Sequence, residues 1–328
     1  MQVTVTGAGG FLGRRLVQQL LARGTIADAT GTLQPITKII ACDLALAADL
    51  ADSRVERIEA DASDPAIISQ LITPETRVVF HLAAVVSVGA EEDFELGMRV
   101  NFDGTRALLE ACRKRAPGCS FLFASSVAVY GGDLPETVDD GTALSPQTSY
   151  GMQKAVGEFL INDYSRRGFV DGRCLRLPTV VVRPGKPNKA ASSFASSIIR
   201  DPLEGREVIC PVPAETSVCI ISPKKVVQGF LHAQTLPASA WGFSRAIPLP
   251  GKTLSVGDML VALEKVAGAN VARRVRFEVD PRIEKIVYGW PTRFRSERAA
   301  RLGFTPDVGM EEVIRAFIAD DLGGTVVK

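Results

Sequence analysis

The chain has 328 residues, of which 46% are hydrophobic and 23% are charged, and its formal net charge at pH 7 is +1. These values are typical of a folded globular protein and exclude a disordered or collagen-like chain. Because the charge shows no basic excess, nucleic acid is not an expected partner. No apolar run approaches the ~20 residues of a membrane span, so we expect no membrane partner. The N-terminal residues lack the basic region and cleavage site of a signal peptide, which favours a cytoplasmic protein.

Short apolar runs alternate with longer helical patterns in the first half of the chain, which is typical of βαβ units around a parallel sheet. The expected strands, rich in Val, Ile, Leu and Phe as strands covered on both faces are, span residues 2–6, 38–42, 54–59, 78–82, 120–124 and 172–177. The expected helices span residues 10–23, 65–71, 94–115 and 149–167. The predicted fold class is therefore α/β, with a Rossmann-type doubly wound parallel sheet.

The pattern changes after about residue 178. Residues 182–197 are rich in Pro, Gly and Ser, and we expect an ordered loop over a binding site there. Residues 256–268 and 309–321 are predicted helices, with isolated strands between them. We therefore expect residues 1–178 to form a dinucleotide-binding domain. Residues 179–328 would form mainly a smaller C-terminal substrate-binding lobe, with some segments returning to the core.

The six cysteines show no C-x-x-C spacing, and the chain has only two histidines. We therefore predict no metal site. Buried thiols in a reducing compartment are the simpler interpretation of the cysteines.

A glycine-rich turn connects the first expected strand to the first expected helix. Gly7, Gly10 and Gly13 have the spacing of a dinucleotide-binding turn, which bends tightly, admits a pyrophosphate and packs the helix on the strand. N–H groups at the start of the helix would bind the phosphates. The candidate cofactor-binding residues of this turn are Gly7, Gly10, Phe11, Leu12 and Gly13. An ordinary glycine-rich loop is the alternative.

Further candidate cofactor contacts follow the next strands. Asp43 closes the second expected strand, where a carboxylate binds both ribose hydroxyls and repels a 2′-phosphate, so we predict NAD rather than NADP. A surface aspartate at a strand end is the alternative. Asp61 and Ala62 could bind the adenine, and His81 is expected to be a packed histidine. Small side chains after the fourth strand would leave room for the cofactor, in the segment formed by Leu82, Ala83 and Ala84.

Two titratable side chains lie four residues apart, at Tyr150 and Lys154. On a helix they share one face, and the ammonium would lower the pKa of the phenol toward working pH, where it can act as a general base. Ser125 and Ser126 follow the fifth expected strand, which places hydroxyls at the carboxyl edge of the sheet, where open α/β sheets bind ligands. The serines could instead cap a loop, and the Y-x-x-x-K spacing also occurs by chance.

The segments TGAGGFLG and SSVAVYG, together with Tyr150-x-x-x-Lys154, resemble the extended short-chain dehydrogenases/reductases, the NAD-dependent epimerase/dehydratase family. This resemblance implies a Rossmann domain that binds NAD and a catalytic set of Ser126, Tyr150 and Lys154. It also implies that Asn101 lies near the cofactor, and that the nicotinamide is contacted by Pro178, Thr179 and Val180. Family members are commonly homodimers through a four-helix bundle, which here would use residues 94–115 and 149–167.

Two departures from the family's patterns narrow the expected activity. Val127 and Ala128 stand where 4,6-dehydratases carry an Asp–Glu pair, so dehydration is disfavoured. Thr179 stands where many nucleotide-sugar enzymes carry asparagine, which argues against nucleotide-sugar binding without excluding it.

Three later segments, at residues 177–194, 198–203 and 289–291, resemble the D-erythronate dehydrogenase branch of this family. That resemblance implies NAD-dependent oxidation of the C2 hydroxyl of a small sugar acid. Arg183 could bind the substrate carboxylate with two parallel hydrogen bonds, although a salt bridge between the lobes explains it equally well. The candidate substrate contacts are Ser87, Ser126, Tyr150, Arg183, Asn188 and Ser193. The serines near residue 192 could instead cap a helix.

Two other functions are compatible with the same residues. A nucleotide-sugar epimerase would retain NAD and return the hydride to the same substrate. A non-catalytic NAD-binding regulator would keep the fold without turnover, but the intact tyrosine and lysine argue against it.

Overall fold

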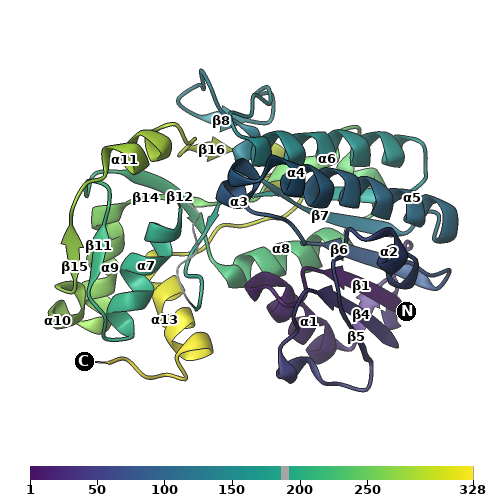
Figure 1. The fold of residues 1–328 in the computed structure, drawn as a ribbon, viewed down its shortest axis with the longest axis horizontal. Helices are drawn as coiled ribbons and strands as arrows, with labels where there is room; N and C mark the ends of the chain where they lie inside the picture. Colours follow the sequence, from purple (N-terminus) through teal and green to yellow (C-terminus); the bar gives the residue numbers. More distant parts are fainter. Residues whose placement is uncertain (186–191, 328) are drawn as a thin grey trace. The chain divides into compact units, whose positions relative to one another are not determined.

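The computed structural model describes residues 1–185 and 192–327, which form two compact units (Figure 1). The first unit comprises Met1–Val129, Pro146–Arg176 and Val227–Pro248. The second comprises Tyr130–Ser145, Leu177–Val226 and Leu249–Lys328. Residues 130–145, which we expected in the first domain, thus belong to the second unit, and residues 227–248 return to the first. The expected division near residue 178 stays a prediction.

The first unit is built on a seven-stranded sheet with the order β13-β9-β7-β6-β1-β4-β5. Its strands are β1 (Gln2–Thr6), β4 (Lys38–Asp43), β5 (Val55–Glu59), β6 (Thr76–His81), β7 (Ser120–Ser126), β9 (Asp171–Leu177) and β13 (Ala246–Pro248). The pairs β1–β4, β1–β6, β4–β5, β6–β7 and β9–β13 are parallel. All six expected strands are confirmed. β13 was not expected, because an apolar run of three residues does not stand out in the sequence.

The order of the strands reverses at β1. From β1 the chain moves outward to β4 and β5, and then returns to the other side of β1 to form β6 and β7. This reversal creates a topological switch point between β1 and β6. Ligands of open α/β sheets bind at such a point, beyond the carboxyl ends of the strands.

Helices cover both faces of this sheet, as a doubly wound fold requires. α2 (Pro65–Leu71), α5 (Thr105–Arg115) and α6 (Ser149–Arg166) bury apolar side chains in one cluster with strand residues such as Val79. Figure 1 shows α5 and α6 side by side. Because neighbouring strand residues face opposite ways, Phe80 points to the other face, where its ring lies 6.3 Å from Phe230 of α8 (Pro223–Thr235). α1 (Phe11–Arg23) buries Leu16, Val17 and Leu20.

Residues 94–115 form three successive helical segments instead of the single expected helix. α4 (Phe94–Gly97) continues into a π-helical segment, η2 (Met98–Gly104), and then into α5. π-helical turns are rare and often occur at functional sites. The predicted cofactor residue Asn101 lies in the middle of η2.

Shorter elements complete the first unit. β2 (Thr25–Ala27) and β3 (Leu33–Pro35) form an antiparallel pair between α1 and β4, which lengthens the chain between Gly13 and Asp43. The remaining helices are η1 (Ala48–Leu50), α3 (Ser87–Glu92), η3 (Val127–Val129) and η4 (Ala238–Trp241).

Within its described residues, the second unit has its own core and three small sheets. In the first, β12 (Ser217–Ile221) lies between β10 (Thr179–Val180) and β14 (Lys252–Ser255). The second pairs β11 (Val208–Cys210) with β15 (Val275–Phe277). The third pairs β8 (Val138–Asp139) with β16 (Phe294–Arg295). Its helices are α7 (Ser193–Leu203), α9 (Val256–Ala267), α10 (Ala269–Ala272), α11 (Pro281–Tyr288), α12 (Glu297–Arg301) and α13 (Met310–Asp321). Side chains from α7, α9 and α13 meet in one buried cluster.

The prediction of a loop over residues 182–197 is wrong from Ser193 onward, where α7 begins. The serines and alanines of this stretch resemble a loop in composition, but Phe194, Ile198 and Ile199 recur at helical spacing and are buried in the core of the second unit. Residues 186–191 lie outside the described part of the chain.

Replacing Gly13 with alanine tests how α1 packs on the glycine-rich turn. The new Cβ would lie 2.0 Å from the Gly7 carbonyl oxygen, so the backbone must shift. We expect the free energy of unfolding to fall by about 2 kcal/mol or more. Gly141→Ala is the control, because its Cβ would have no neighbour nearer than 3.5 Å, and it should change stability by less than ~0.5 kcal/mol. Denaturant titration of both variants measures this, and equal stabilities would contradict the packing.

Candidate functional site

The glycine-rich turn lies directly against the segment that follows β6. Gly7 has a φ of +73°, and a Cβ at this position would lie 2.6 Å from the backbone nitrogen of Ala83. Only glycine meets both conditions. α1 then begins after Gly10, with no acidic residue in its first turn to oppose an anion. The turn therefore fits the pyrophosphate of a dinucleotide.

Asp43 ends β4 beside this turn. Its Oδ2 atom accepts hydrogen bonds from the backbone N–H groups of Gly9 at 2.9 Å and Gly10 at 3.2 Å. The structure thus brings the predicted ribose-binding carboxylate to the glycine-rich turn. Gly9 was missed as a site residue, although a Cβ there would lie 1.9 Å from the Ala45 carbonyl oxygen. The Gly9–Gly10 doublet is the signal in the sequence that could have found it.

Asp61 follows β5 and is held by two neighbours. Its Oδ1 accepts from the N–H and the hydroxyl of Ser63 at 2.8 and 2.6 Å, and its Oδ2 lies 2.7 Å from the Arg99 guanidinium. Burial acts to raise the pKa of Asp61, but the hydrogen bonds from Ser63 and Arg99 outweigh it, and the pKa is lowered. The carboxylate is therefore fixed in place next to the buried Ala62. Contact of this pair with adenine stays a prediction.

A chain of buried hydrogen bonds connects β1, β6 and η2. The Thr105 hydroxyl donates to the Asn101 carbonyl at 2.7 Å, so it must accept from Nε2 of His81 at 2.9 Å. Nδ1 of His81 then accepts from the Thr6 hydroxyl at 2.7 Å. Burial lowers the pKa of His81 to about 3, and the charge of Lys154 acts in the same direction. His81 is thus a neutral, packed residue, as expected.

Asn101 fixes the segment between β6 and α3. Its Oδ1 accepts from the N–H of Val85 at 2.8 Å, and its Nδ2 donates to the carbonyl of the same residue at 2.9 Å. Nδ2 also donates to Oε1 of Gln153 at 2.7 Å. The predicted substrate contact Ser87 begins α3 two residues after Val85. The predicted cofactor contacts Leu82, Ala83 and Ala84 precede Val85 in the same segment.

The three predicted catalytic residues come from β7 and α6 of the first unit. Thr148 caps α6 by accepting from the N–H of Gly151, so Tyr150 lies in the first turn and Lys154 one turn later. Nζ of Lys154 lies 5.7 Å from the centre of the Tyr150 ring. Ser126 ends β7. A Cβ at Gly151 would lie 2.2 Å from the carbonyl oxygen of Ala128, so the start of α6 packs on the segment that follows Ser126.

Ser125 and Ser126 have different environments. The Ser125 hydroxyl is buried and donates to Oε1 of Glu158 at 2.5 Å. Ser126 is only half-buried, and its Oγ accepts from the N–H of Ala128 at 3.1 Å. Ser125 therefore has a structural contact, which leaves Ser126 as the better candidate for contact with a substrate.

Lys154 is buried within the first unit. Burial lowers its pKa to about 7, while Cys174 and Glu158 act to raise it. Glu158 cannot neutralise the lysine fully, because its carboxylate is bound by the Arg176 guanidinium at 2.7 and 2.9 Å. Nζ of Lys154 also lies 4.6 Å from the centre of the Phe123 ring, within cation–π distance. The amino group thus exchanges its proton close to neutral pH.

The remaining predicted residues belong to the second unit. Pro178 precedes β10, in which Thr179 and Val180 pair with β12. The N–H of Arg183 donates to Oγ of Ser196 at 3.1 Å, and its carbonyl accepts from Arg200 at 3.2 Å. Ser193 begins α7, and Asn188 lies outside the described residues. Their contacts with cofactor or substrate stay predictions.

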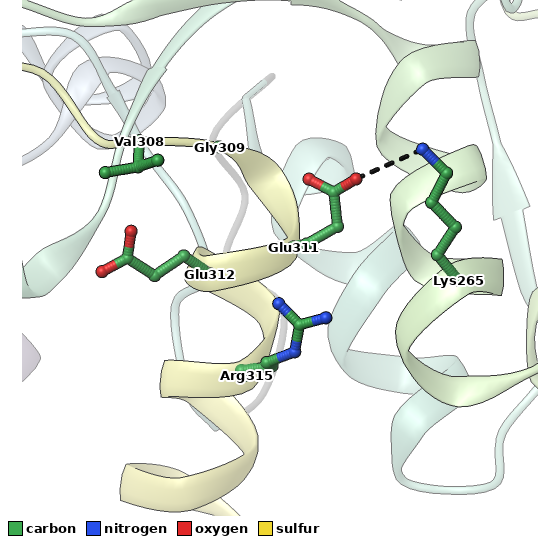
Figure 2. Close-up of a pocket in the computed structure, with 6 residues that line it drawn as sticks. All are labelled: Lys265, Val308, Gly309, Glu311, Glu312 and Arg315. Atoms are coloured by element: carbon green, nitrogen blue, oxygen red, sulfur yellow. Dashed lines mark hydrogen bonds and ion pairs between the residues drawn. The ribbon is translucent and has the colours of Figure 1, made fainter.

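A hollow of about 370 Å³ in the second unit is drawn in Figure 2. Its charged lining includes Lys265, which forms an ion pair with Glu311 at 3.4 Å. None of the predicted site residues belongs to it, so it is not the candidate active site. In the described part of the chain, no three His, Cys, Asp or Glu side chains gather as metal ligands would. None of the described helices has both the length and the hydropathy of a membrane span.

Residues 3–234 match the NAD dependent epimerase/dehydratase family. The chain belongs to this family. It is 51% identical over 320 residues to the D-erythronate dehydrogenase of Cupriavidus necator, covering 98% of both chains, and 46% identical over 322 residues to that of Haemophilus influenzae, covering 98% of this chain and 100% of the other. A solved structure of a nucleoside-diphosphate-sugar epimerase from Agrobacterium tumefaciens matches with a TM-score of 0.92 and 39% identity, over 99% of this chain and 95% of the other. These findings confirm the predicted family, the fold class and NAD as the cofactor.

The burial of Lys154 predicts a specific dependence of stability on pH. Its pKa is about 7 in the folded chain against an ordinary value of 10.5, so between these values the unfolded chain holds a proton that the folded chain has released. This contribution therefore makes the folded state more stable as pH rises from 7 toward 10.5. Lys154→Met removes it. The unfolding free energy of the unmodified protein minus that of the variant should increase across this interval.

Denaturant titrations at several pH values measure this difference. Lys265→Met is the control, because Lys265 is 64% exposed, and its difference from the unmodified protein should stay flat. A flat or falling difference for Lys154→Met would show that burial does not lower the pKa of the lysine in the folded chain.

Proposed function

We propose that this protein is a D-erythronate dehydrogenase, which oxidises the C2 hydroxyl of D-erythronate to give 2-dehydro-D-erythronate and NADH. The observation that carries this proposal is the likeness over 98% of both chains to the D-erythronate dehydrogenase of Cupriavidus necator. The arrangement of Tyr150, Lys154 and Ser126 in the first unit supports it, because a CH–OH oxidation needs a group to remove the hydroxyl proton.

Each of the three residues has a separate role in the proposed reaction. The phenolate of Tyr150 takes the proton of the C2 hydroxyl, and the Ser126 hydroxyl donates a hydrogen bond to the same oxygen. Lys154 in its charged form stabilises the phenolate, since opposite charges attract strongly where water is excluded. When bound, NAD supplies the hydride acceptor. The C2 carbon thus loses a hydride, its hydroxyl loses a proton, and a ketone forms.

The first unit also supplies the proposed cofactor contacts. The glycine-rich turn would bind the pyrophosphate, and Asp43 would bind the adenosine ribose from its position beside Gly9 and Gly10. Asp61 with Ala62 would bind the adenine. Nearer the nicotinamide, we propose contacts from Leu82, Ala83, Ala84, Asn101, Pro178, Thr179 and Val180.

We propose that the substrate is a small sugar acid. Arg183 is the proposed partner for its carboxylate, because a guanidinium binds a carboxylate with two parallel hydrogen bonds. Hydroxyl contacts are proposed for Ser87 and Ser193.

A homodimer through residues 94–115 and 149–167 and a cytoplasmic location complete the proposal. Phe94 and Phe159 lie on these helices with 51% and 63% of their surfaces exposed. Exposed aromatic side chains on two neighbouring helices fit an interface between two copies of the chain.

Tyr150→Phe tests the assignment of the base. The variant keeps the ring but loses the hydroxyl that takes the proton, so we expect kcat to fall by about 10²- to 10⁴-fold while NAD affinity is retained. Steady-state NADH formation and NAD titration measure the two effects. Tyr164→Phe on the same helix is the control, since that hydroxyl contacts Glu110, and it should keep normal turnover. A Tyr150→Phe variant with near-normal kcat would rule out this base.

A substrate panel tests the reaction itself. With D-erythronate and NAD we expect NADH to accumulate, and four- and five-carbon aldonic acids should define the specificity. The likeness to the Agrobacterium protein described as a nucleoside-diphosphate-sugar epimerase makes epimerisation the second candidate, which would convert a nucleotide sugar without net NADH. Turnover of nucleotide sugars alone would overturn our proposal. Binding of NAD without turnover of any member would favour a regulator.

A further inference from the structure

Gln153 lies between the two proposed catalytic residues of α6 but contacts a different part of the first unit. It is 0% exposed. Its Nε2 is close to α4, because a Cβ on Gly97 would lie 2.7 Å from it. Its Oε1 accepts a hydrogen bond from Nδ2 of Asn101 at 2.7 Å. The side chain therefore connects α6 to η2.

The orientation of this amide pair follows from the backbone. Val85 presents both an N–H and a carbonyl to Asn101, so Oδ1 of Asn101 must face the N–H and Nδ2 must face the carbonyl. Nδ2 has one further hydrogen to donate, and only the oxygen of Gln153 can accept it. Both amides are thus assigned without ambiguity.

Only one of the two polar atoms of the Gln153 side chain has a hydrogen-bond partner among the described residues. Its Nε2 is buried and has no hydrogen-bond partner among the described residues, and a buried unpaired donor costs about 1–3 kcal/mol. An apolar side chain of similar length would remove this unpaired donor, but it would also remove the acceptor for the second hydrogen of Asn101 Nδ2.

The hydrogen bonds from Gln153 to Asn101 and from Asn101 to Val85 join two parts of the proposed active site. α6 carries Tyr150 and Lys154, whereas the segment after β6 carries Val85 between the proposed cofactor and substrate contacts. A shift of either part by about 1 Å would misalign the base and the substrate, and such shifts cost on the order of 10²-fold in rate.

We propose that Gln153 is a positioning residue, which acts through Asn101 to hold the segment between β6 and α3 in register with the proposed general base on α6. This inference rests on the proposed function for its effect on catalysis. The hydrogen-bonded link itself can be tested without any activity.

Gln153→Met keeps the length and burial of the side chain but removes the acceptor. We expect kcat to fall by about 10- to 100-fold, while the Kd for NAD changes by less than about threefold. Gln153→Glu keeps an acceptor oxygen and should recover part of kcat. Gln234→Met is the matched control, because Gln234 is also buried in this unit and its Nε2 donates to the Ala27 carbonyl at 2.6 Å. It should keep kcat. A folded Gln153→Met variant with normal kcat would overturn the proposal.

Amide hydrogen exchange at Val85 provides the readout that does not need turnover. Exchange should be faster in Gln153→Met than in the unmodified protein, and unchanged in Gln234→Met. If the Met variant does not fold, Gln153→Ala serves the same comparison. Failure of the unmodified protein to oxidise any aldonic acid would refute the proposed function but would leave the exchange experiment decisive for the link. Unchanged exchange at Val85 would refute the link.

Discussion

The amino group of Lys154 is buried in the first unit, and the arrangement around it controls how firmly it holds a proton. An isolated buried ammonium would lose its proton readily, whereas one paired with a carboxylate would keep it. Here the nearby carboxylate of Glu158 is already bound by Arg176, and the amino group also lies 4.6 Å from the centre of the Phe123 ring. The pKa of the lysine is therefore lowered to about 7, so that near neutral pH its charged and neutral forms are both populated. Such a group can support a change of charge on the neighbouring phenol at moderate cost.

The hydrogen bonds around His81, in the same unit as this lysine, join neutral groups. Thr6, His81 and Thr105 connect β1, β6 and η2 without a charged group, and His81 stays neutral because burial lowers its pKa to about 3. A charged His81 would have added to the cost of burying Lys154. The π-helical turn brings Asn101 into the same network, so that both its backbone carbonyl and its side-chain amide have partners.

The features that could be predicted from the sequence are those determined by a few neighbouring residues. The glycine-rich turn, the expected strands and the helical spacing of Tyr150 and Lys154 are local patterns, and the structure contains each of them. β13 was missed because only its pairing with β9 makes three residues a strand. α7 was mistaken in part for a loop, because its apolar positions are recognisable only when the core that they fill is known.

In the candidate site, too, the contacts that could not be predicted join residues far apart in the sequence. The environments of Ser125 and Ser126 differ because Glu158, some thirty residues further along the chain, binds only the first. The contact between Gln153 and Asn101 likewise joins residues 52 positions apart. The spacing of residues in the sequence does not predict contacts between positions so far apart, whereas the folded structure shows them directly.

The interleaving of the two units has a consequence for how the protein is made. β13 pairs with β9 in the sheet of the first unit, yet about seventy residues, most of them in the second unit, separate the two strands in the chain. The chain must therefore be synthesised as far as Pro248 before that sheet can be completed. A fragment that stops near residue 178 would lack β13 and leave the edge of β9 unpaired. Exposed edges of this kind promote aggregation. Truncated forms of the protein should thus depend on chaperones more than the whole chain does.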